Sequence, residues 1–71
     1  MGSVIQSNPE TLSGQPVFVG TRVPFRALLD YLESGHTLKE FLEDFPTVTR
    51  DQAVAAIEEA GEAILAQART A

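Results

Sequence analysis

The stretch TLKEFLEDFPTVTRDQAVAAI, residues 37–57, predicts two helices separated by a short turn. Thr37 and Thr49 each precede an apolar helical run and each has a Glu or Gln three residues later, which is the capping-box signature of a helix start. Pro46 ends the first helix because proline cannot continue a helical hydrogen-bond ladder. The proportions are those of a helix-turn-helix, with the helix after Thr49 in the recognition position. The first of the two helices presents one apolar face made of Leu38, Phe41, Leu42 and Phe45.

A third helix precedes this pair. Its apolar face is formed by Phe25, Leu28, Leu29 and Leu32, and Gly35 follows as its C-terminal stop. The helix after Thr49 continues for roughly 19 residues, about 28 Å. We therefore expect a single domain over residues 1–71, mainly α, in which residues 24–71 form a three-helix, homeodomain-like core. Residues 1–23 should add N-terminal strands and a loop.

The N-terminal β element is predicted around Gly20 and Thr21. Residues 16–19 read as a buried strand because β-branched and aromatic side chains dominate them. Gly20–Thr21 then fits a two-residue turn with glycine first, and residues 22–23 would form a short return strand. Pro24 would stop that strand and open the next helix. Residues 4–5 are a candidate for a further short strand.

Composition argues against an enzyme. The chain has 71 residues, no cysteine and one histidine, His36, which lies in a predicted turn. Glycine-rich nucleotide motifs are missing from the sequence, so we expect no catalytic residue, no metal site and no cofactor. The sequence shows neither a signal peptide nor a membrane-spanning run, which suggests a soluble, cytoplasmic protein. Residues 1–3, Met-Gly-Ser, are equally well read as a cloning remnant.

The charge distribution conflicts with simple DNA binding. The net charge is −5, and residues 37–62 hold two basic against seven acidic side chains, a difference of −5 on that segment alone. Arg50 and Gln52 could read DNA from the first turn of the recognition helix, but the acidic field predicts weak duplex binding. Arg22 and Arg26 are either internal ion-pair partners or contacts for phosphate or for an acidic partner surface.

The long C-terminal helix predicts self-association. So small a domain cannot bury all of its apolar positions, so we expect a homodimer. Gly61, in the middle of the helix, is either a small core residue or a point of close helix contact. The candidate dimer contacts are Gly61, Ile64, Leu65 and Ala68.

The segment from Ser13 to about Ala68 resembles the small bacterial proteins of domain-of-unknown-function family 433. The resemblance rests on a Gly-x-Pro, a Gly-Thr-Arg-aliphatic-Pro motif, a helix-ending Gly, an aromatic-Pro and a Thr: residues 14–16, 20–24, Gly35, 45–46 and Thr49. It implies a homeodomain-like or winged-helix-like helix-turn-helix fold. It also implies an antitoxin-like role, because family members are often encoded beside candidate toxins of the PIN-like nuclease type.

Three functions follow as hypotheses. The first is a non-enzymatic antitoxin-like module that covers a basic toxin and helps repress its own operon as a dimer, since an acidic surface suits a basic nuclease groove. The second is a helix-turn-helix transcriptional regulator without a toxin. The third is a plain dimerisation module of a larger assembly.

Overall fold

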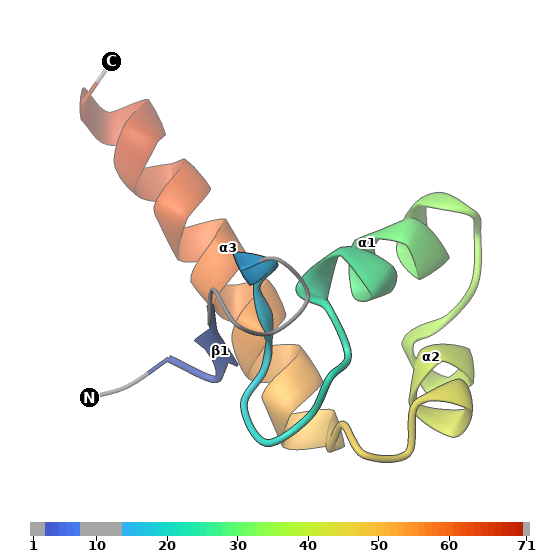
Figure 1. Cartoon of the computed structure of the whole chain (residues 1–71). Coiled ribbons are helices and arrows are strands. Elements are labelled where there is room, and N and C mark those ends of the chain that lie inside the picture. Colours follow the sequence, from blue (N-terminus) through green and yellow to red (C-terminus); the bar gives the residue numbers. More distant parts are fainter. Residues whose placement is uncertain (1–2, 8–13, 71) are drawn as a thin grey trace.

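The computed structural model describes residues 3–7 and 14–70, and it is mainly helical (Figure 1). This confirms the expected fold: three helices preceded by a small antiparallel β element. The elements are β1 (Ile5–Gln6), β2 (Val17–Phe18), α1 (Phe25–Glu33), α2 (Leu38–Asp44) and α3 (Arg50–Thr70). Within the described residues, no helix combines the length and the apolar character needed to cross a membrane.

The β element differs from the expected one. β2 pairs with β1, in the register Ile5 opposite Phe18, and not with a strand at residues 22–23. The segment after the turn contributes one isolated bridge, Val17 opposite Pro24, flanked by a hydrogen bond from Phe18 N to the Val23 carbonyl at 3.0 Å. The prediction of a return strand was wrong because Pro24 has no N–H for a ladder and the chain enters α1 directly after it.

The turn itself is shifted by one residue from the prediction. Thr21 N donates to the Phe18 carbonyl at 3.0 Å, so the turn spans residues 18–21 and Gly20 is its third residue, not the first of a two-residue loop. Gly20 has φ +79°, which confirms that this glycine has the positive φ the turn requires. The Thr21 hydroxyl also stabilises the turn: it donates to the Phe18 carbonyl at 2.9 Å and accepts from Val23 N at 3.0 Å.

Helix ends follow the sequence signals closely. Thr37 and Glu40 form a complete capping box at the start of α2, and Thr49 and Gln52 form the equivalent bonds at the start of α3. α1 begins after Pro24, which lies in the N-cap position, and it ends before Gly35, whose φ is +88°. The prediction of all three helices is therefore confirmed, and α3 is slightly longer than expected at 21 residues.

The core draws at least one buried side chain from β2 and from every helix. Phe41 lies at its centre, with ring centroids 6.2 Å from Phe18, 5.5 Å from Tyr31 and 4.9 Å from Phe45. The Tyr31 hydroxyl donates to Asp44 at 2.6 Å, which ties α1 to α2 at the edge of this cluster. The buried cluster consists of Phe18, Leu28, Phe41, Val48, Ala53 and Ala56.

The capping box of α2 makes a testable contribution to pH stability. Thr37 N donates to Glu40 Oε1 at 2.8 Å, and this bond holds the pKa of Glu40 below its ordinary value of 4.5, with His36 nearby acting in the same direction. A carboxyl whose pKa is lowered by folding stabilises the fold fully above its ordinary pKa, and the benefit is lost as the pH falls through the lowered value.

Glu40→Gln is therefore expected to flatten the fall of the melting temperature below about pH 4.5, because glutamine can fill the same capping position without titrating. Circular-dichroism melts at several pH values would measure it. Glu43→Gln, on an exposed residue of the same helix, is the matched control and should keep the wild-type profile because it leaves the Thr37–Glu40 bond in place. Identical pH profiles for Glu40→Gln and wild type would contradict the assignment.

Candidate functional site

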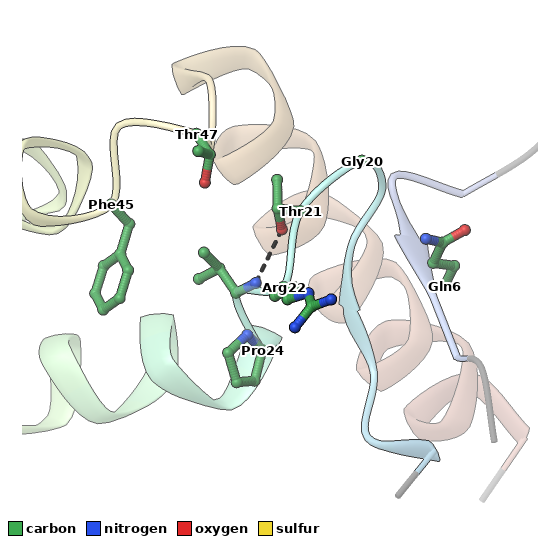
Figure 2. Close-up of a pocket in the computed structure, with 8 residues that line it drawn as sticks. Gln6, Gly20, Thr21, Arg22, Pro24, Phe45 and Thr47 are labelled. Carbon is green, nitrogen blue, oxygen red and sulfur yellow. Dashed lines mark hydrogen bonds between the residues drawn. The ribbon is translucent and has the colours of Figure 1, made fainter. Parts of the chain in front are cut away.

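A cavity of about 560 Å³ opens where the N-terminal turn meets the connection between α2 and α3 (Figure 2). Three separate segments of the chain contribute to it: β1, the turn with the residues that lead into α1, and the residues just after α2. It is the meeting point of the Gly-Thr-Arg motif and the aromatic-Pro segment. The lining residues are Gln6, Gly20, Thr21, Arg22, Val23, Pro24, Phe45 and Thr47.

Local hydrogen bonds fix the wall that carries Arg22. The Thr21 hydroxyl bonds to the backbone on both sides of the turn, so the residue between Thr21 and Val23 is held at both ends. Figure 2 shows the Arg22 side chain between Gln6 on one side and Phe45 on the other. The structure therefore presents Arg22 from a constrained backbone.

Arg22 is the cation of this cavity. It is exposed, and within residues 3–7 and 14–70 it has no hydrogen bond or ion pair. The same described part of the chain places no carboxylate in the lining, while Gln6 and Thr47 add polar atoms and Phe45 and Pro24 add apolar surface. An unpaired guanidinium beside such surface is suited to a carboxylate or phosphate, which it can hold through two parallel hydrogen bonds.

Arg26 is in a different state. Its guanidinium contacts Asp30 at 3.0 Å and Glu33 at 3.1 Å, both from its own helix. It lines a second, smaller hollow of about 320 Å³ beside Pro16 and Phe25, away from Arg22. Of the two alternatives for this arginine, the structure shows the internal ion pair, so its positive charge is largely offset locally.

The two candidate contact residues in the first turn of α3 differ in whether they are free to bind a partner. Gln52 is committed to the fold: its Oε1 accepts from Thr49 N at 3.1 Å and its Nε2 donates to the Val19 carbonyl at 2.9 Å. Arg50 is exposed, and the described residues offer it no hydrogen bond or ion pair. Of the four candidate contact residues, Arg22 and Arg50 are therefore available to a partner, whereas Arg26 and Gln52 are already engaged.

Comparison with known proteins places these features in a family. The model of DUF433, described as a protein of unknown function, matches residues 5–60, which include the whole of the Arg22 cavity. This chain belongs to the DUF433 family. It is also 33% identical over 49 residues to the uncharacterized protein y4eO of Sinorhizobium fredii, covering 69% of this chain and 22% of that protein. The DUF433 chain thus spans about a fifth of that relative's length, and no solved structure matches it significantly.

Three of the four candidate dimer contacts of this DUF433 chain lie beyond the part of α3 that packs on the core. Ile64, Leu65 and Ala68 are exposed, and Gly61 is half-buried. Among residues 3–7 and 14–70, no atom lies within 4 Å of a β-carbon placed on Gly61, so this part of the chain supplies no close packing there. Both alternatives for Gly61, a small core residue and a point of close helix contact, stay predictions.

Two long-range contacts of the DUF433 chain have no signal in its sequence. Glu59 accepts from the Ser3 hydroxyl at 2.6 Å and from Val4 N at 3.2 Å, which ties the N-terminal segment to α3. Gln52 reaches Val19 across a separation of 33 residues. Neither contact has a spacing signal in the sequence. His36 lies 3.5 Å from Glu40, and the described residues contain no group of three metal-ligating side chains.

Proposed function

We propose that this chain is a non-enzymatic, antitoxin-like module that binds and covers a basic toxin protein. The family likeness suggests a toxin of the PIN-like nuclease type. Binding as a dimer would also allow the module to help repress its own operon. The observation that carries the proposal is the charge of α2 and α3, because exposed carboxylates run along the surface that a DNA-binding protein would turn towards phosphate.

The electrostatic support comes from the described helices. Asp51, Glu58 and Glu62 are exposed on α3, and Glu43 and Asp44 are exposed on α2. A nuclease groove is basic because it must attract phosphate, and a carboxylate-rich helix can occupy it in place of nucleic acid. Arg22, in its cavity, would add a contact to a carboxylate of the same partner and so fix the orientation of the complex.

The second candidate is a helix-turn-helix regulator, which the order α2, turn, α3 favours. Two features of the structure weigh against it. Gln52, which could have read a base, is bonded to Val19 and Thr49, and Arg26 is offset by two carboxylates. Arg22, Lys39, Arg50 and Arg69 remain as exposed cations for phosphate, and four phosphate contacts at most, set among the carboxylates of α2 and α3, give little affinity at physiological salt.

We expect the purified chain to bind duplex DNA, including its own promoter, no more tightly than about 10 μM at physiological salt. The basic product of the adjacent gene should bind more tightly, with an affinity that falls as salt rises because charge drives the encounter. Calorimetry across a salt series, on promoter DNA and on the adjacent gene product, would measure both.

Glu58→Gln combined with Glu62→Gln should weaken the protein complex, because it removes two exposed charges from α3. Ala66→Gln, on an exposed residue of the same helix, is the control that leaves the charge unchanged. Nanomolar binding of the wild-type chain alone to its promoter would reverse the ranking in favour of the regulator. In that case Arg50→Ala should relax sequence preference, and Arg22→Ala should weaken binding to all DNA alike.

A further inference from the structure

α3 carries a row of apolar side chains that the single chain leaves uncovered. Val54 and Ile57 are 36% and 39% exposed, while Ile64 and Leu65 are 66% and 53% exposed. The half nearer the core is thus partly covered by the domain, and the outer half is bare where α3 runs past the rest of the molecule (Figure 1). Large apolar side chains grouped on one exposed helix face indicate a contact surface.

Five positions on this face are placed symmetrically about Gly61, whereas Ile64, three residues after it, has Glu58 as its counterpart three residues before it. Val54 and Ala68 lie seven residues on either side of it, and Ile57 and Leu65 lie four residues on either side. Spacings of four and seven place all five residues on one helix face. A surface that matches itself after a two-fold rotation is what an isologous dimer requires.

We propose that two copies of the chain associate through α3 in antiparallel orientation, crossing at Gly61. In this register Ile57 of each copy meets Leu65 of the other, and Val54 meets Ala68. The exposed part of α3 after Gly61 in one copy then covers the partly buried part of α3 before Gly61 in the second copy. The proposal concerns the chain alone and does not rest on the toxin.

Gly61 has a physical role in this arrangement that it lacks in the single chain. A glycine inside a helix costs about 1 kcal/mol relative to alanine, and no atom of the described residues within 4 Å of its missing β-carbon explains the cost here. At the crossing point, the missing side chain lets the two helix backbones approach closely. Ile57 and Leu65 can then interlock on both sides of the crossing.

Charge acts in two ways in the antiparallel orientation, because the flank that carries Asp51 and Arg69 also carries Glu58 and Glu62, which would lie near Glu62 and Glu58 of the second copy. Asp51 and Arg69 lie on the same flank of the apolar row, near opposite ends of α3. Antiparallel pairing brings Arg69 of one copy beside Asp51 of the second copy, and does so twice. Parallel pairing in register would leave Arg69 and Asp51 of the two copies about 27 Å apart along the helix axis, so neither ion pair could form.

Disulfide trapping tests the orientation, and the chain suits it because it has no cysteine of its own. Ile57→Cys and Leu65→Cys chains, one of them carrying a tag that changes its mass, are mixed and oxidised mildly. The antiparallel register predicts the mixed disulfide between positions 57 and 65 and little linkage in either variant alone. The two copies of position 57 would stand about 12 Å apart along the pair axis, too far for a disulfide. Linkage of each variant to itself would show parallel pairing and overturn the proposal.

Sedimentation provides the second measurement. The wild type should sediment as a dimer at high micromolar concentration, and Leu65→Glu should shift it to the monomer without loss of helical signal, because Leu65 is outside the core. Ala66→Glu, exposed on another face of α3, adds the same charge and should remain dimeric. A wild type that stays monomeric, or one whose dimer survives Leu65→Glu, would overturn the proposal. The disulfide-trapping and sedimentation experiments both use the purified chain, so their outcomes are independent of toxin binding.

Discussion

Phe41→Ala is expected to leave the chain largely unfolded at room temperature. Phe41 is fully buried, and its ring contacts those of Phe18, Tyr31 and Phe45. Removing a buried phenylalanine costs about 3–5 kcal/mol, whereas small domains have a total stability of about 5–15 kcal/mol. A domain of 71 residues lies near the lower end of that range because its core is thin. Urea unfolding followed by circular dichroism would measure the loss.

Phe25→Ala is the matched control for this variant. Phe25 is half-buried at the start of α1, with its ring centroid 6.1 Å from that of Phe18. The same side chain is removed, but less apolar area is returned to water, so the loss of unfolding free energy should be clearly smaller. Equal losses for the two variants would mean that Phe41 is not the centre of the core.

Gly20→Val should lower the free energy of unfolding by more than about 1 kcal/mol. Gly20 has φ +79°, a conformation that a β-branched residue adopts only with strain. A β-carbon at this position would meet no atom of the part of the chain that the structure describes within 4 Å, so the loss would report backbone conformation and not a steric clash with those residues. Thermal melts of the purified variant would measure it.

A graded series at the same position separates strain from any other effect. Gly20→Asn should be the mildest substitution, because asparagine tolerates positive φ, and Gly20→Ala should lie between it and Gly20→Val. A melting temperature for Gly20→Val equal to that of the wild type would show that the turn can re-form with another geometry.

The helices could be predicted because their signals are local. Threonines at positions 37 and 49, each followed three residues later by a side chain that can return a hydrogen bond, mark two helix starts without any tertiary information. The turn at Gly20 could not be placed in the same way. A glycine with positive φ fits the second position of one hairpin turn and the third of another. The choice depends on the Thr21 hydroxyl and on the pairing of β2 with β1, both of which are tertiary outcomes.

The candidate site was predicted in part for the same reason. Arg22 could be singled out because it lies in the Gly-Thr-Arg motif. The ion pair of Arg26 with Asp30 could be predicted because the two residues have the helical spacing of four. The bond between Gln52 and the Val19 carbonyl joins segments far apart in the chain, and it engages within the fold a side chain that the helix-turn-helix pattern predicts to contact a partner. The cavity is likewise invisible in the sequence, because three segments must fold together to enclose it.

The continuity of α3 has a mechanical consequence. The helix runs from Arg50 to Thr70 without a break at Gly61, so its outer turns move with the domain as a stiff lever. At a rise of about 1.5 Å per residue the lever is roughly 30 Å long, so a tilt of about 10° at its base displaces its tip by about 5 Å. A spectroscopic probe on the last turns would therefore magnify small rotations of the domain.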